Sequence, residues 1–216
     1  MTAELNLKEI ERKAFRSTFQ DGLTDIQHGL VVISMAIFIY RPADGYRPLN
    51  IILAVLLISL AGGLFMAGKK YITLPRMGQV RFGAVRKQKR STLAIILGVI
   101  VLLQIGLLGL TTQGWLNPQA AASINDFLTS HDLMLVAVAL IGALIVGTSM
   151  TFIAYFSDFP RGYYIAMMMS LAVFVMIYFN RPLYPILIGV LVLLPGLVLL
   201  VRFLKAYPLP KEASNE

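Results

Sequence analysis

Three residues near the start of the chain carry the groups best suited to chemistry. Asp21, Asp25 and His28 follow one another at i, i+4 and i+7, so on a helix they share one face. Two carboxylates and an imidazole so arranged could hold a divalent cation or act as a general base. A structural interpretation competes, because Asp21 could cap a helix whose positive end favours both acids. We prefer the structural interpretation and predict no catalytic residue, metal or cofactor.

A basic loop at 69–91 offers partners for these acids, since it holds eight Lys and Arg residues. Its first half alternates apolar and polar side chains, which predicts a short β-hairpin of Tyr71–Leu74 and Gln79–Phe82 around a turn at Pro75. The acidic face and this hairpin together form the candidate interaction surface, made of Asp21, Asp25, His28, Arg76 and Arg81.

The elements that must position these residues are six apolar windows, each close to the roughly 20 residues that cross a bilayer as a helix. An amphipathic segment at 1–22 precedes them and a polar tail at 205–216 follows. The sequence therefore predicts an all-α membrane protein with spans at 23–40, 49–67, 92–112, 133–156, 163–179 and 186–204.

The distribution of cations predicts the orientation of the spans. Of nineteen Lys and Arg residues, only Arg41, Arg47 and Arg181 fall on loops of one side. Because basic loops are retained in the cytoplasm, we expect both termini inside and three hairpins pointing outward in a cell membrane.

Composition excludes several classes of protein. Hydrophobic residues make up 57% of the chain and charged residues 14%, against roughly a quarter charged in soluble domains. The absence of cysteine excludes a disulfide framework, a thiolate metal site and a cysteine nucleophile. The net charge of +8 is explained by topology and by anionic lipid headgroups at the cytoplasmic face, so we expect no nucleic-acid partner.

Polar groups inside the predicted spans are few. No Asp, Glu, Lys or Arg lies near the middle of any of them, which counts against a proton-driven pump. Gln104, Thr148 and Ser149 are the candidates for a polar path, although such groups more often bond a neighbouring helix or their own backbone.

Two motifs resemble those of uncharacterised multi-span membrane proteins of bacteria and archaea, to which no activity is attached. One is FQDGLTDIQHG from Phe19 and the other is YITLPRMGQVRF from Tyr71. The resemblance implies that the two motifs form one cytoplasmic surface. The Asp-Gly pair is also similar to that of CDP-alcohol phosphotransferases, but their further Ala-Arg, Gly and Asp positions are missing after Asp25, which excludes that family.

The sequence favours a non-enzymatic role, as a scaffold, an accessory subunit or a lipid-interacting module. A membrane-protein partner or a second copy of the chain would suit such a role. The alternative is a small permease component with a path beside Gln104, Thr148 and Ser149. A membrane-interface enzyme using Asp21 and Asp25 with His28 is the third interpretation.

Overall fold

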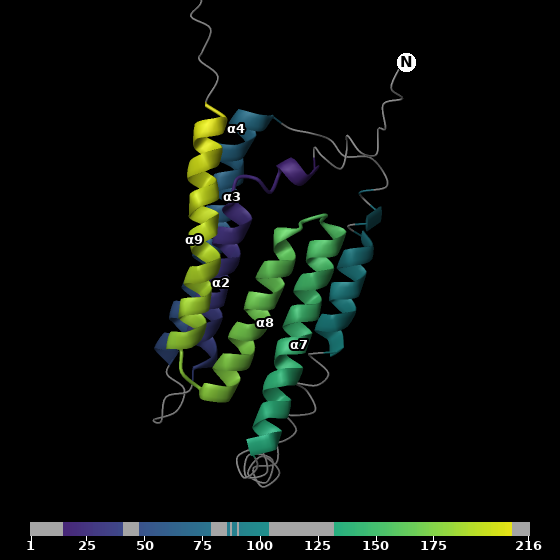
Figure 1. Ribbon diagram of the computed structural model, residues 1–216, viewed down its shortest axis with the longest axis vertical. Helices are drawn as coiled ribbons and strands as arrows, with labels where there is room; N and C mark the ends of the chain where they lie inside the picture. The colour runs from purple at the N-terminus through teal and green to yellow at the C-terminus, as the bar shows by residue number, and fades with distance from the viewer. Residues whose placement is uncertain are drawn as a thin grey trace, which may run out of the picture.

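A computed structural model describes residues 15–40, 48–78, 86, 88, 89, 91–103 and 132–208. All regular structure in these ranges is helical (Figure 1). The elements are α2 (Leu23–Ile39), α3 (Pro48–Gly68), η1 (Lys69–Thr73), α4 (Leu74–Met77), α7 (Asp132–Phe156), α8 (Arg161–Phe179) and α9 (Leu183–Ala206), with a further helical stretch at Ser91–Leu103.

The long helices run side by side as a bundle, with α2 at its centre (Figure 1). Helix α2 packs against α3, α8 and α9, while α7 packs mainly against α8. Helix α2 is also the element that carries Asp25 and His28. Two of the side chains that the sequence singled out therefore lie on the helix that packs against three of the other long helices.

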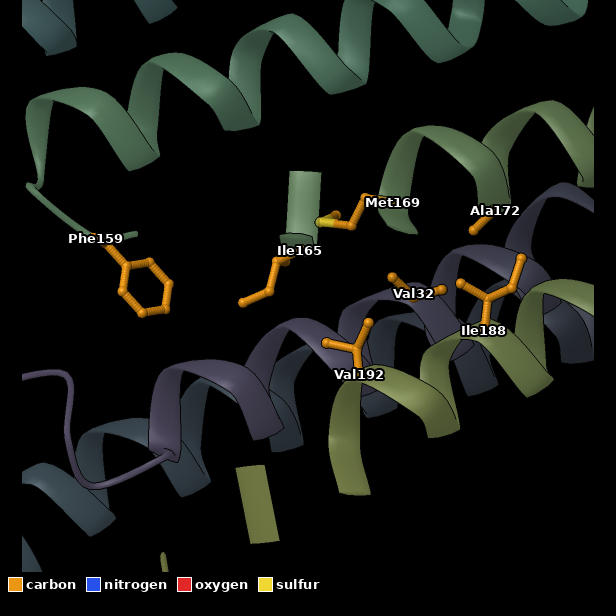
Figure 2. Packing of buried hydrophobic residues seen from close by; sticks show 7 residues of the cluster. All are labelled: Val32, Phe159, Ile165, Met169, Ala172, Ile188 and Val192. Atoms are coloured by element: carbon orange, nitrogen blue, oxygen red, sulfur yellow. The ribbon is translucent and has the colours of Figure 1, made fainter. Parts of the chain in front are cut away.

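The bundle is held together by an apolar core between α2, α8 and α9 (Figure 2). Val32, Ile165 and Val192 are each at most 2% exposed, and they meet where these three helices approach one another. A small cavity of about 10 Å³ beside this core is lined only by apolar side chains, among them Met35 and Met176. The middle of the described bundle is thus filled with hydrocarbon side chains.

Glycines allow α2 and α9 to pack at backbone distance. A Cβ on Gly29 would lie 2.8 Å from the Gly189 carbonyl oxygen, and one on Gly189 would lie 2.9 Å from that of Gly29. Gly22, with φ of 71°, turns the chain into α2, and a Cβ there would lie 2.2 Å from the Gly196 carbonyl oxygen. Only glycine fits such contacts without separating the helices.

The prediction of six spans is wrong, because in the described residues four helices are long and apolar enough to cross a membrane. These are Pro48–Met77, Leu135–Phe156, Arg161–Phe179 and Leu183–Ala206. The helices in the predicted spans 23–40 and 92–112 are shorter, at Leu23–Phe38 and Ser91–Leu103. With a rise of 1.5 Å per residue, the 17 residues of α2 (Leu23–Ile39) extend only about 26 Å, less than the roughly 30 Å of hydrocarbon.

The predicted β-hairpin is also wrong, because Tyr71–Leu74 is helical and continues α3 through η1 into α4. Pro75 lacks the amide hydrogen and its ring crowds the carbonyl of the preceding turn. The chain accommodates it by widening that turn into a π-helix, in which the Leu74 amide donates to the Lys69 carbonyl. The alternation misled because Thr73, assigned to the polar face, is buried, whereas Leu74 is exposed.

Several predicted features lie outside the described residues. They are the segment before Phe15, the second predicted strand with Arg81, the polar residue Gln104 and the end of the tail after Pro208. The predicted outward hairpins are likewise only partly covered by the described ranges.

Candidate functional site

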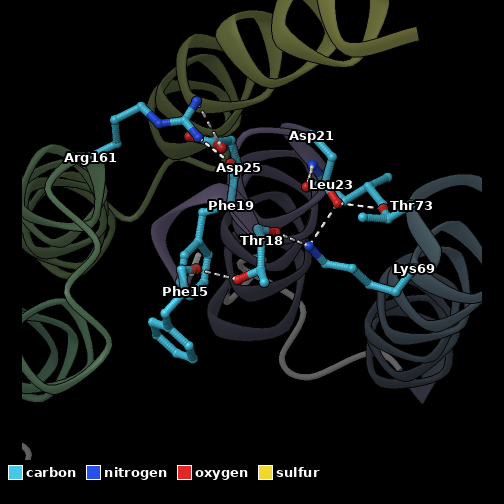
Figure 3. Close-up of polar contacts among 9 residues, drawn as sticks. All are labelled: Phe15, Thr18, Phe19, Asp21, Leu23, Asp25, Lys69, Thr73 and Arg161. Atoms are coloured by element: carbon cyan, nitrogen blue, oxygen red, sulfur yellow. Dashed lines mark hydrogen bonds and ion pairs between the residues drawn. The ribbon is translucent and has the colours of Figure 1, made fainter. Parts of the chain in front are cut away.

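Asp21 is fully buried at one end of the bundle and accepts three hydrogen bonds (Figure 3). Its Oδ1 accepts from the Leu23 amide at 3.1 Å, and its Oδ2 accepts from Thr73 Oγ1 at 2.6 Å and from Lys69 Nζ at 2.7 Å. Lys69 also donates to the Thr18 carbonyl. The carboxylate therefore joins the entry of α2 to the π-helical turn after α3.

The π-helical turn explains how one carboxylate oxygen receives two donors. Lys69 and Thr73 begin and end η1, so the widened turn presents both side chains to the same side of the helix. A buried carboxylate needs such donors, because burying a charge without a partner is costly. We call the end of the bundle where Asp21, Asp25, Lys69, Asp158 and Arg161 lie the polar end.

Asp25 faces a different cation from a different helix. Its Oδ2 lies 3.5 Å from Arg161 Nη1, at the first residue of α8, and the side chain of Asp25 is 5% exposed. The same guanidinium donates through Nη2 to the Phe19 carbonyl (Figure 3). The ring of Phe19 in turn stacks on Phe159 at 4.7 Å. Arg161 and this aromatic pair therefore bind the start of α8 to the segment before α2.

A third carboxylate, Asp158, was not singled out from the sequence. It lies in the turn between α7 and α8 with φ of 48°, and its Oδ2 accepts from Arg86 Nη1 at 2.7 Å. The Arg86 guanidinium also lies 3.9 Å from the centre of the Phe15 ring, and Lys89 Nζ is 3.9 Å from the carboxylate. The sequence did offer a signal for this pair, because Asp158 is the one acidic residue in a turn that the orientation places on the same side as the basic loop.

His28 does not join the two acids. Its Nδ1 lies 2.6 Å from the Thr24 carbonyl oxygen, so Nδ1 carries the hydrogen and donates within α2. Asp21 and Asp25 are engaged by cations of α3–η1 and α8 instead. Across the described ranges no three His, Cys, Asp or Glu side chains come together as metal ligands would. The three residues at i, i+4 and i+7 therefore make three separate contacts.

The remaining predicted site residues are dispersed. Arg76 donates to the Ile72 carbonyl of its own helical segment and pairs with neither Asp21 nor Asp25 among the contacts above. Ser149 donates to the Ile145 carbonyl at 2.7 Å, also within its own helix. Thr148 is exposed on α7. The structure therefore brings Asp21, Asp25 and His28 to the polar end but leaves Thr148 and Ser149 on a separate helix.

Comparison of the chain with models of known protein families, with curated proteins and with solved structures finds no match. The resemblance of the two motifs to prokaryotic membrane proteins therefore stays a prediction. What the chain does has to be inferred from its own contacts and composition. The four long apolar helices in the described part of the chain are compatible with a membrane protein.

Proposed function

We propose that the chain is a non-enzymatic protein of the cytoplasmic membrane that serves as a scaffold or accessory subunit. The observation that carries this proposal is the pairing of the polar end. Asp21, Asp25 and Asp158 each face a cation from another part of the chain. Carboxylates used in this way hold segments together, and a substrate or metal would have to displace the cation that faces each of them.

The apolar interior supports the same proposal over a permease. The core between α2, α8 and α9 consists of side chains such as Val32, Met169 and Val192. Ser149 satisfies its hydroxyl within α7. A permease path needs polar groups that converge on a water-filled cavity, and the mid-bundle cavity beside this core has an apolar lining.

The proposed orientation places the polar end and both termini in the cytoplasm. The cations of the polar end, including Lys69, Arg86 and Arg161, belong to segments that the positive-inside rule assigns to that side. Exposed cations there, such as Lys70 and Lys205, would lie at the level of anionic headgroups. Each such contact contributes about 1 kcal/mol to membrane association.

We propose that a membrane-protein partner contacts the polar end around η1 and α4. Tyr71 is 68% exposed there, and aromatic and arginine side chains are the residues that most often dominate protein interfaces. Arg76 lies on the next turn, and its side chain makes its contact to the backbone of its own segment. These two side chains can meet a partner without any change to the ion pairs that hold the helices together.

Charge reversal of Arg76 tests this proposal against a matched control. Arg76→Glu and Lys205→Glu make the same charge change at the polar end, the second on the last turn of α9. Tagged wild type and both variants would be purified from host membranes into nanodiscs, and the co-purifying proteins quantified by mass spectrometry. We expect one near-stoichiometric partner that Arg76→Glu reduces at least about tenfold, equivalent to 1.4 kcal/mol, and that Lys205→Glu retains.

Thermal stability of the same samples separates binding from folding. Both variants should match wild type in melting temperature, because neither side chain forms an ion pair with another helix among the residues that the structure describes. Equal loss of the partner in both variants would indicate only a general attraction of charges. A protein that purifies alone with a small molecule or a defined lipid would contradict the proposal and favour transport or lipid handling.

A further inference from the structure

A small cavity lies at the polar end between α2, α7 and α8. Its volume is about 40 Å³, four times that of the cavity beside the core. Most of its lining is apolar, but three of its side chains are polar: Thr24, His28 and Ser157. A cavity of this size with several polar groups on its wall differs from the smaller, apolar-lined cavity in the middle of the bundle.

Thr24 supplies an unsatisfied donor on the wall of this cavity. The residue is 6% exposed, and its Oγ1 is buried without a hydrogen-bond partner among the residues that the structure describes. Buried hydroxyls in proteins nearly always have a partner, because losing the bonds made to water is costly. Because Thr24 lines the cavity, a molecule held there is the nearest candidate partner for this hydroxyl.

His28 supplies an acceptor on the same wall. Because Nδ1 donates to the Thr24 carbonyl at 2.6 Å, the neutral imidazole must carry its hydrogen on Nδ1 and keep a lone pair on Nε2. A partner that accepts from the Thr24 hydroxyl and donates to this ring nitrogen needs both a lone pair and a hydrogen. Water has both.

We propose that the cavity bounded by Thr24, His28 and Ser157 is an internal hydration site whose ordered waters connect the Thr24 hydroxyl with the His28 imidazole. A buried water needs roughly 10–15 Å³ of such space and two to four polar partners. The volume of about 40 Å³ therefore has room for about two or three waters. In this arrangement His28 Nε2 accepts a hydrogen bond from internal water, a property separate from the proposed scaffold role.

Solid-state NMR of the full-length protein in lipid bilayers tests this directly. The chain has two histidines, so ¹⁵N-histidine labelling of a His131→Gln variant leaves His28 as the single signal. We expect Nδ1 to be the protonated nitrogen, and magnetisation to pass from water to the ring at a rate typical of bound water. Absence of this transfer, or a ring protonated at Nε2 alone, would overturn the proposal.

Two substitutions at Thr24 give an independent measurement. Thr24→Val keeps the shape and removes the hydroxyl, whereas Thr24→Ser keeps the hydroxyl. With waters in place, valine should lower the melting temperature by several degrees and reduce the water-to-His28 transfer at least twofold, and serine should preserve the transfer. A rise in melting temperature in Thr24→Val would show that the cavity holds no water around the hydroxyl. Unchanged water-to-His28 transfer in Thr24→Val would show that Thr24 does not bind the water. If a Thr24 variant does not fold, the water-to-His28 transfer measured on the chain with native Thr24 decides whether the cavity holds water.

Discussion

Replacing Asp21 by asparagine should remove most of the stability that the polar end contributes. The carboxylate is fully buried and accepts from Lys69, Thr73 and the Leu23 amide. Asparagine has nearly the same shape, but it carries no charge and turns an amino group toward one of the donors. Removing one partner of a buried ion pair costs about 3–5 kcal/mol. Because the Lys69 side chain is 24% exposed, we expect the lower value, about 3 kcal/mol.

A double-mutant cycle in detergent or bicelles measures this coupling. The free energy of unfolding would be determined for wild type, Asp21→Asn, Lys69→Met and the double variant. Residues in one ion-pair network couple by about 0.5–3 kcal/mol, and we expect the upper part of that range. Arg76→Gln is the control, because this guanidinium bonds only its own segment in the contacts described and should change stability by less than about 0.5 kcal/mol.

The reasoning would be refuted by an additive cycle. If the single variants each cost several kcal/mol and the double variant costs their sum, the two side chains do not act on each other. If Asp21→Asn is as mild as Arg76→Gln, the buried carboxylate does not join α2 to α3–η1. In either case the structural interpretation of the polar end, and with it the argument for a scaffold, would lose its support.

Two further substitutions probe the packing of α2. Gly22→Ala should prevent stable folding, because it combines a positive φ with a Cβ 2.2 Å from the Gly196 carbonyl oxygen. Gly63→Ala, whose added Cβ would have nothing within 4 Å, should be neutral or stabilise by up to about 1 kcal/mol. The yield of monodisperse protein in size-exclusion chromatography compares the two variants. Ser34→Ala should cost about 1 kcal/mol, since the buried hydroxyl donates to the Ala54 carbonyl at 2.6 Å; a melting temperature equal to wild type would argue against that contact between α2 and α3.

The positions of the long helices follow from local sequence to within a few residues. The windows predicted at 49–67, 133–156, 163–179 and 186–204 correspond to α3, α7, α8 and α9. A helix satisfies its backbone hydrogen bonds within its own segment, so a long apolar run is sufficient to specify one. The windows at 23–40 and 92–112 were predicted as spans on apolar composition, but the helices described within them are too short to count as candidate spans.

The segment from Lys69 to Met77 shows how a local pattern can point to the wrong structure. Alternation over a few residues fits a strand, but here it lies on a helix that extends α3. Two long-range contacts fix its position in the bundle, since Lys69 and Thr73 both donate to Asp21, 48 and 52 residues away. A two-residue period carries no information about such a partner.

The sequence by itself determined that this chain is rich in apolar helices, that Asp21, Asp25 and His28 are close together, and that cations collect on a few segments. These are properties of neighbours along the chain, which spacing and composition describe. Only the tertiary structure decided that Asp21 pairs with Lys69, Asp25 with Arg161 and Asp158 with Arg86. Each pair joins residues far apart in sequence, and its formation depends on glycine contacts and core packing that bring separate segments to within ion-pair distance.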